Sequence, residues 1–535
     1  MYDCILKNGT IVKGDGSEPF KGDVAIKDGK IAKVSSHIDS QCQEVLDISG
    51  KYISPGFIDI HSHSDLTLIA NSLGESKLYQ GVTTEVVGNC GLTAFPLSDE
   101  QRRKSLAFID VPNLEWEWKN TDEYLHVQSK YITAINRVPL VGYGSIRAKV
   151  MGYSESVANE EQIKAIAEEL ESCFKAGIWG LSIGLGYAPD FYSNEDELVE
   201  AAKVVKKYDR VFSFHVRGER DTLFKAIQEV INIARRSGAN VEISHLKCAH
   251  ISNIGRMNEI LKMITDARQD GLNINFDQYP YTAGNSYLGL VFPPYAHRDG
   301  MDGLMDILGS KEQREILKHD MLHGINTWCS MLNLGQADNL IVSNIPEQFN
   351  QYLGKSISDI ASSMGVDVAE AACCLMEKCN GKVEMLIHQQ RESDLKLAMA
   401  NPLGSFGSDG FAMDKGEIIQ KGRPHPRSFG TFPRVIKKYV REEGVLTLEN
   451  AISKMTWKNA SKIRLFDRGL IEEGFVADLV VFDIDKIEDT ATYDNPFSYA
   501  KGIEHVIVSG EFEIKDGQMT GLLQGKQLLR SDYGN

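Results

Sequence analysis

Short apolar runs recur along the chain between segments with helical periodicity. Each run opens after a glycine or a polar residue, as buried strands commonly do. Near-continuous apolar strands that alternate with amphipathic helices indicate a parallel sheet covered by helices, and eight such units predict an α/β protein with a (β/α)8, TIM-like barrel. The eight runs cover residues 56–63, 81–90, 138–145, 177–185, 211–218, 241–248, 274–281 and 403–409.

Two of the predicted helices carry clear start signals. Asn159 is followed by Gln162 in a capping-box pattern, and Ile166 and Leu170 continue the chain at helical spacing. Asn194 stands before a similar amphipathic segment and is expected to begin the next helix.

The gap between residues 281 and 403 is far longer than one barrel crossover requires. We therefore predict an inserted subdomain at about 285–345, placed as a lid over the barrel mouth. Residues 357–379 have the pattern of a barrel helix and are predicted to return to the barrel.

The two ends of the chain have strand-like alternation and hairpin turn signals instead. The signals are Asn8-Gly9, Asp28-Gly29, Ser509-Gly510 and Asp516-Gly517. Neither end makes a convincing sheet alone, so residues 1–54 and 466–535 are predicted to form one small β-sandwich beside a barrel at 55–465. The polar tail after Leu523 is expected to fray.

Composition and charge narrow the function classes. The net charge of −16 disfavours sequence-independent binding to nucleic acid, which needs a basic surface. The nine cysteines are odd in number and show no Cys-x-x-Cys pair, which favours a reducing compartment. No apolar run approaches the ~20 residues of a membrane helix, and no signal-peptide pattern follows Met1. We expect a cytoplasmic protein with no nucleic-acid or membrane partner.

Metal-ligand residue types stand where five of the eight predicted strands end. His61 and His63 have the same-side spacing of a strand, and single residues follow at later strand ends. Strand ends meet at the carboxyl face of a barrel, so these side chains are predicted to converge on a metal site. Each residue alone could be a core or turn residue. The full set is His61, His63, Cys90, His215, His245 and Asp409.

Imidazole with a thiolate favours zinc over magnesium or calcium. Cys90, His215 and His245 would supply three ligands and leave an open position for water or substrate. Zinc lowers the pKa of a bound water to ~7, and Asp409 could take that proton and deliver it to a leaving nitrogen. The predicted chemistry is metal-assisted hydrolysis at a carbonyl.

With these residues the chain resembles the amidohydrolase superfamily, and within it the D-aminoacylases (N-acyl-D-amino-acid deacylases), over essentially its whole length. The stretch Pro55-Gly56-Phe57-Ile58-Asp59-Ile60-His61-Ser62-His63 is a superfamily signature. Gly88-Asn89-Cys90-Gly91 is more specific, because most relatives bridge two metals with a carboxylated lysine or a glutamate. Further similar segments are Ile243-Ser244-His245-Leu246-Lys247, Tyr279-Pro280-Tyr281-Thr282-Ala283-Gly284, Ser408-Asp409-Gly410 and Pro424-His425-Pro426-Arg427-Ser428-Phe429-Gly430-Thr431-Phe432-Pro433-Arg434.

The resemblance implies zinc-dependent hydrolysis of N-acyl-D-amino acids to a carboxylate and a free D-amino acid, with Asp409 as general base and acid. It implies one tight Zn²⁺ site at Cys90, His215 and His245. A second, weaker site is implied at His61, His63, Cys90 and Asp409. Matched substrate contacts are Tyr187, Lys247, Tyr279 and Arg427. The planar guanidinium of Arg427 also suits an α-carboxylate on physical grounds.

Departures from the family pattern and other activities stay open at this point. Asn285 stands where a small hydroxyl residue is common, and the stretch between Asp409 and Arg427 is longer than usual. A dipeptidase for peptides with a C-terminal D residue would use the same chemistry. A dihydroorotase- or hydantoinase-like cyclic-amide hydrolase is disfavoured by Cys90. A non-catalytic assembly protein is disfavoured by the complete ligand set.

Overall fold

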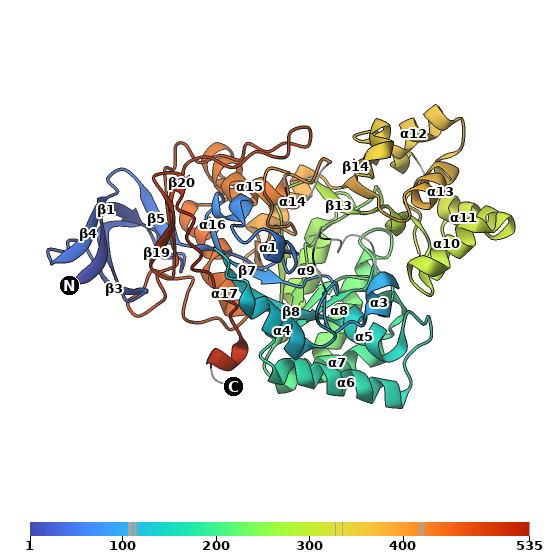
Figure 1. Cartoon of the computed structure of the whole chain (residues 1–535), viewed down its shortest axis with the longest axis horizontal. Helices are drawn as coiled ribbons and strands as arrows, with labels where there is room; N and C mark the ends of the chain where they lie inside the picture. Colours follow the sequence, from blue (N-terminus) through green and yellow to red (C-terminus); the bar gives the residue numbers. More distant parts are fainter. Residues whose placement is uncertain are drawn as a thin grey trace.

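The structure is a computed structural model and describes residues 1–104, 111, 114, 116–326, 328–333, 335–416, 418 and 422–533. Three parts follow one another along its long axis (Figure 1). A β-sheet built from both chain ends lies at one end, the barrel lies in the middle, and an inserted segment lies at the other end.

Eight parallel strands form the barrel, in the order β6-β7-β8-β9-β10-β11-β12-β16. Each of the eight predicted apolar runs overlaps one of them, so the predicted barrel is confirmed. The strands are β6 (Phe57–Asp59), β7 (Val82–Val87), β8 (Asn136–Gly142), β9 (Gly180–Gly184), β10 (Val211–His215), β11 (Asn240–Ile243), β12 (Ile274–Gln278) and β16 (Gly404–Phe406).

The helices of this part begin where the capping signals predict. The Asn159 side chain accepts a 2.9 Å hydrogen bond from the backbone of Gln162, and the Asn194 side chain accepts one of 2.9 Å from the backbone of Glu197. The helices are α1 (Thr67–Ala70), α2 (Glu75–Leu78), α3 (Asp99–Lys104), α4 (Thr121–Lys130), α5 (Tyr143–Met151), α6 (Glu160–Lys175), α7 (Glu195–Lys207), α8 (Leu223–Ser237), α9 (Met257–Gln269), α14 (Glu392–Ala400), α15 (Arg427–Arg434), α16 (Leu448–Met455) and α17 (Trp457–Lys462).

The seam between the first and last barrel strands, β6 and β16, is closed by side chains and loops. The ammonium group of Lys77 on α2 lies 2.7 Å from Asp59, 2.9 Å from Glu85 and 2.8 Å from the Ser408 hydroxyl. All four residues are fully buried. Just beyond, the backbone N–H of Asp409 donates to the carbonyl of His61 at 2.7 Å. The seam therefore sets the first and eighth strand ends side by side.

Both chain ends contribute to one nine-stranded sheet, in the order β20-β19-β18-β17-β5-β1-β2-β3 with β4 beside β1. The two halves meet where β5 pairs antiparallel with β17. The strands are β1 (Tyr2–Ile11), β2 (Phe20–Lys27), β3 (Lys30–Ser35), β4 (Cys42–Asp47), β5 (Tyr52–Pro55), β17 (Leu479–Phe482), β18 (Ile503–Val508), β19 (Glu511–Lys515) and β20 (Gln518–Met519). The prediction that both chain ends build one β-domain is confirmed, and the strands of the predicted sandwich pair in one continuous sheet.

Two local predictions at the chain ends are wrong. Asn8-Gly9 is a bulge inside β1, where the pairing with β2 shifts register, because the left-handed Asn8 (φ 62°) is absorbed within a continuing strand. The tail after Leu523 is held along the barrel. The backbone N–H of Gly525 donates to Thr133 at 2.7 Å, and the Trp179 indole donates to Leu528 at 2.6 Å.

The inserted segment contains a three-stranded antiparallel sheet, in the order β13-β15-β14, and four helices. The prediction that residues 357–379 return to the barrel is wrong. Their apolar faces are buried against the other inserted helices in one hydrophobic cluster, and α14 takes the barrel position. The elements are β13 (Ala283–Tyr287), α10 (Met301–Gly309), α11 (Lys311–His323), β14 (Leu340–Asn344), α12 (Ile357–Met364), α13 (Val368–Lys378) and β15 (Glu384–His388).

In the described part of the chain, no helix combines the length and apolar character that crossing a bilayer requires. The boundaries predicted at residues 54, 285 and 465 stay predictions, whereas the elements of the inserted segment continue past residue 345 to the end of β15 at His388.

Replacement of Lys77 by Met is expected to destabilise the protein by about 3 kcal/mol, because Asp59 and Glu85 would remain buried without their cation. The measurement is the unfolding midpoint in urea at neutral pH. Lys164→Met is the matched control, since Lys164 is exposed and its ion pair with Glu168 is long, at 3.7 Å. Equal midpoints for the two variants would contradict the seam's structural role.

Candidate metal centre

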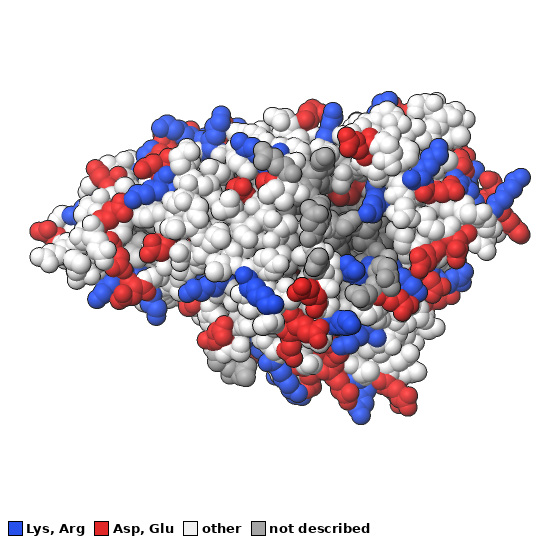
Figure 2. Space-filling model, viewed as in Figure 1, with Lys and Arg blue, Asp and Glu red and all other residues white. Residues whose placement is uncertain are grey.

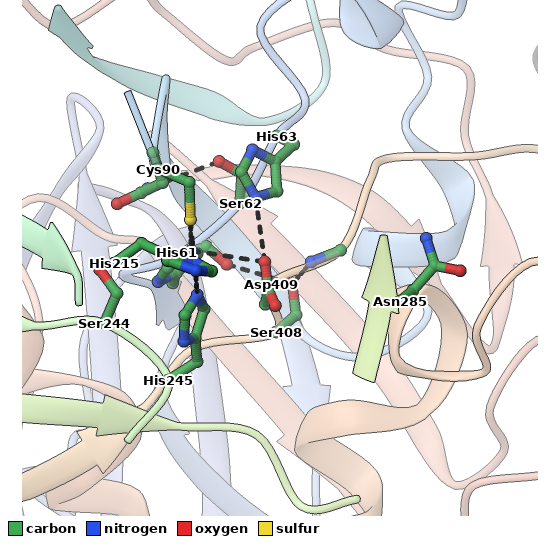
Figure 3. A network of polar contacts seen from close by, with 12 residues as sticks. His61, Ser62, His63, Cys90, His215, Ser244, His245, Asn285, Ser408 and Asp409 are labelled. Carbon is green, nitrogen blue, oxygen red and sulfur yellow. Dashed lines mark hydrogen bonds and ion pairs between the residues drawn. The ribbon is translucent and has the colours of Figure 1, made fainter. Parts of the chain in front are cut away.

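The six predicted ligands stand at the carboxyl ends of the barrel strands. His61 and His63 follow β6, Cys90 follows β7, His215 ends β10 and His245 follows β11. Asp409, which follows β16, closes the ring from the other side of the seam. Figure 3 shows Cys90, His61 and Asp409 pointing toward one another.

The potential metal-ligand atoms of these side chains lie close enough together to bind the same metal ion. Cys90 Sγ lies 3.3 Å from His61 Nε2 and 3.5 Å from His245 Nε2. Asp409 Oδ1 lies 2.9 Å from His63 Nε2 and 3.4 Å from His61 Nε2. The ligand atoms of His61, Cys90, His245 and Asp409 all lie within 4.8 Å of one another. His215 is adjacent, with its Nδ1 2.9 Å from His245 Nε2.

Three of these residues leave their strands through the left-handed region of backbone space. Their φ angles are 55° for Cys90, 35° for His245 and 52° for Asp409. Non-glycine residues rarely adopt this conformation, and such strain concentrates at functional sites. The flanking Gly91 also has a positive φ of 72°, and a Cβ there would lie 2.1 Å from a carboxylate oxygen of Asp190. The chain turns sharply at each position.

The electrostatics of the cluster favour a thiolate. Burial alone would raise the pKa of the Cys90 thiol, but the imidazoles of His61 and His245 hold that pKa well below its ordinary value. Burial would also raise the pKa of Asp409, yet Arg427 and then His245 hold it well below the usual range. Burial lowers the pKa of His215, which favours the neutral ring that a metal needs.

Second carboxylates orient two of the imidazoles. Asp277 Oδ2 lies 3.2 Å from His61 Nδ1, and its other oxygen accepts the backbone N–H of His245 at 2.8 Å. Glu219 lies 3.3 Å from His245 Nδ1 and 2.5 Å from Lys247 Nζ. The same His245 Nδ1 lies 2.9 Å from Lys247 Nζ, so Glu219, Lys247 and His245 form one contact network that orients the imidazole with its Nε2 facing Cys90.

Sequence reasoning missed Glu219 and Asp277. The ligand atoms of His215, Glu219 and His245 form a second group within 4.8 Å. The signal was present, because Glu219 follows the β10 strand end by four residues. A carboxylate in a strand-end loop is also common on surfaces, so residue type alone did not single it out.

The four predicted substrate contacts line one open cavity beside the cluster, together with Asn285. Arg427 Nη1 lies 2.6 Å from Asp409 Oδ2, and its guanidinium carbon lies 5.0 Å from the ring centre of Tyr279. The Tyr187 ring lies 4.8 Å from that of His215. Figure 2 shows the surface hollowed between the barrel and the inserted segment. The structure thus brings together all the residues that the sequence singles out.

Comparison with known proteins shows which proteins share this fold and sequence. The profile of the Amidohydrolase family matches residues 394–512. Over nearly its whole length the chain is similar to D-aminoacylase from Alcaligenes xylosoxydans xylosoxydans, with 30% identity over 532 residues that cover 99% of this chain and 98% of the relative. The chain belongs to the D-aminoacylase family of the amidohydrolase superfamily.

Two further members of the D-aminoacylase family show how its activities vary. N-acyl-D-aspartate deacylase from the same organism is 30% identical over 528 residues, which cover 98% of this chain and 95% of the relative. A solved structure of N-acyl-D-glutamate deacylase from Bordetella bronchiseptica superposes with a TM-score of 0.83 at 28% identity, covering 99% of both chains. That protein is in complex with zinc and a phosphonate inhibitor, a mimic of the reaction's tetrahedral intermediate.

As a member of the D-aminoacylase family, the protein is a metal-dependent amidohydrolase. Its own donor set fits zinc, because the low-pKa thiolate of Cys90 lies with the imidazoles of His61 and His245 and the carboxylate of Asp409 in one buried group, and His215 adjoins it through His245. The outer carboxylates Asp277 and Glu219 complete the ring orientation that such sites need.

Cys90→Ala is expected to remove tightly bound zinc. The thiolate lies between the ring nitrogens of His61 and His245 and is the anionic ligand of the predicted tight site. The loss of affinity should exceed the ~100-fold cost of losing an outer-shell partner. Zinc content after dialysis against a chelator measures it. Cys173→Ala, at a buried cysteine on α6 that contacts Thr121 at 3.1 Å, should keep wild-type zinc. Stoichiometric zinc in Cys90→Ala would refute the assignment.

Proposed function

We propose that this amidohydrolase cleaves the amide bond of N-acyl-D-amino acids and releases a carboxylate and a free D-amino acid. The observation that carries the proposal is Arg427 at 2.6 Å from Asp409, beside the cluster and inside the cavity. A cation that could bind a carboxylate therefore lies next to the candidate proton carrier. Full-length similarity to D-aminoacylase supports the substrate class.

We assign the tight zinc site to Cys90, His215 and His245, and a weaker site to His61, His63, Cys90 and Asp409. Zinc bound there would polarise the scissile carbonyl and make water acidic enough to ionise near neutral pH. Three protein ligands would leave one coordination position free for water or substrate. The chain's own residues then have to bind the substrate and move one proton.

Asp409 is assigned as the general base and acid. Its two oxygens face different partners, with His63 at 2.9 Å from Oδ1 and Arg427 at 2.6 Å from Oδ2. The carboxylate would take a proton from the attacking water and deliver it to the amide nitrogen as the C–N bond breaks.

Arg427 is assigned to the α-carboxylate of the substrate, since a guanidinium can bind two carboxylate oxygens at once. Tyr279 lies under that guanidinium, and its buried hydroxyl has no hydrogen-bond partner among the described residues. A buried hydroxyl of this kind is a donor available to the substrate. Tyr187 and Lys247 line the same cavity and complete the proposed contacts.

The substrate class is tested with matched N-acetyl-D- and N-acetyl-L-amino acids on the zinc-loaded protein. We expect hydrolysis of the D series with rates for the L series at least about 100-fold lower, because a fixed carboxylate clamp and a fixed metal admit one configuration at the α-carbon. Cleavage of D-terminal dipeptides or cyclic amides alone would replace the proposal with one of those activities.

Asp409→Asn should keep zinc at the tight site while kcat falls by about 10²- to 10⁴-fold, the range for loss of a general acid–base group. Steady-state kinetics with metal analysis of the same sample measures both. Asp414→Asn is the matched control, because Asp414 is buried nearby but accepts backbone N–H groups of Gly416 and Ile418. A near-normal kcat in Asp409→Asn would refute its role.

A further inference from the structure

Arg220 stands between two acidic residues in sequence and pairs with neither. Within the part of the chain that the structure describes, its guanidinium has no carboxylate at ion-pair distance. Its side chain is half-buried and lines the site cavity. Burial lowers the pKa of Arg220 below its ordinary value, although the group stays a cation at neutral pH.

Both neighbouring acids are engaged elsewhere. Glu219 binds Lys247 at 2.5 Å. Asp221 accepts the Ser252 hydroxyl and the Cys329 thiol, the latter at 3.2 Å, and lies 3.1 Å from His250 Nδ1. The loop thus satisfies the two carboxylates with other donors and leaves the guanidinium directed into the cavity.

Among the described residues, the one side chain hydrogen-bonded to the Arg220 guanidinium is an amide. Arg220 Nη2 lies 3.4 Å from Gln389 Oε1, a long hydrogen bond from a charged group. Gln389 follows β15, so this contact joins a barrel loop to the inserted sheet. A Cβ on Gly284 would lie 3.7 Å from Gln389 Nε2 and 3.3 Å from the Tyr279 hydroxyl. Glycine at 284 therefore keeps open the space between this pair and the Arg427 side of the cavity.

Partial removal of a cation from water costs free energy when no anion pairs with it, and a bound anionic ligand would offset that cost. The cavity wall around it includes the apolar residues Leu290, Trp328 and Ile387, which suit the methylene groups of a short chain. Of the other acids that line the cavity, Asp409 pairs with Arg427 at 2.6 Å, and Glu384 is held by the amides of Asn285 at 3.4 Å and Asn344 at 3.1 Å. Arg220 and Gln389 thus form a donor pair on the wall of a partly apolar cavity.

We propose that Arg220 and Gln389 form a subsite for a second carboxylate of the substrate, in addition to the α-carboxylate at Arg427. The proposal rests on the proposed function and narrows it to N-acyl-D-amino acids that carry a further carboxylate. Arg220 supplies a two-pronged donor, and the Gln389 amide supplies another. The second carboxylate has two chemical sources, an acidic side chain on the D-amino acid or a dicarboxylic acyl group.

Two isosteric pairs of substrates separate the sources. N-acetyl-D-glutamate is compared with N-acetyl-D-glutamine, and N-succinyl-D-alanine with its terminal carboxamide. N-acetyl-D-alanine reports the basic activity. The wild-type protein should prefer the charged member of one pair by about 10- to 100-fold in kcat/KM, the range for a hydrogen bond to a charged group.

Arg220→Gln should abolish that preference and leave kcat/KM for the uncharged member within about threefold. Arg220→Lys keeps the charge and should retain part of the preference. Arg235→Gln is the control, since Arg235 is an exposed arginine on α8 paired with Asp270 at 3.3 Å. Inhibition by the products D-glutamate and D-glutamine gives a binding readout, and zinc content reports folding.

Each outcome bears on the subsite. Loss of preference in Arg220→Gln together with weaker inhibition by the charged product of the responding pair, D-glutamate or succinate, supports it, and the responding pair names the source. If wild type cleaves N-acetyl-D-alanine but shows no preference in either pair, the subsite is refuted and the proposed function stands. An equal loss on charged and uncharged members in Arg220→Gln refutes it as well. If no N-acyl-D-amino acid is cleaved, both proposals fall.

Discussion

The candidate site depends on one buried ion cluster at the barrel seam. Lys77 lies against Asp59 and Glu85 at 2.7 and 2.9 Å, with no exposure to solvent. Two carboxylates around one ammonium group would be unstable there without further donors. The hydroxyl of Ser408 donates to Asp59 at 2.5 Å and that of Ser64 to Glu85 at 3.0 Å. The cluster thus connects the end of β6 to the loop after β16, two strands that do not pair with each other in the barrel sheet.

This closure sets the distance between the two halves of the proposed chemistry. The imidazoles of His61 and His63 extend from the first strand, and Asp409 extends from the last, so their separation is the width of the seam. If the ends of β6 and β16 lay farther apart, the same ligand residues would be present, but their side chains would no longer meet at one point. The left-handed turn at Asp409 (φ 52°) then aims its carboxylate inward.

Sequence reasoning located the barrel because buried parallel strands are continuous apolar runs, and their ends carry the chemistry. It failed where tertiary packing outweighs a local pattern. The helices α12 and α13 have the amphipathic period of barrel helices, and the period does not say which core their apolar face meets. Glu219 was missed for a similar reason, since its role follows from a ring nitrogen 3.3 Å away on another strand end.

The pairing of β5 with β17 has a consequence for synthesis of the chain. β5 leads directly into the first barrel strand, yet its antiparallel partner is translated only after the whole barrel and the inserted segment. At ~5–20 residues per second, the edge of β5 waits on the order of 20 seconds or longer for that partner. The terminal sheet is therefore completed only after the barrel and the inserted segment have been translated. Until then, the edge of β5 that pairs with β17 stays unpaired.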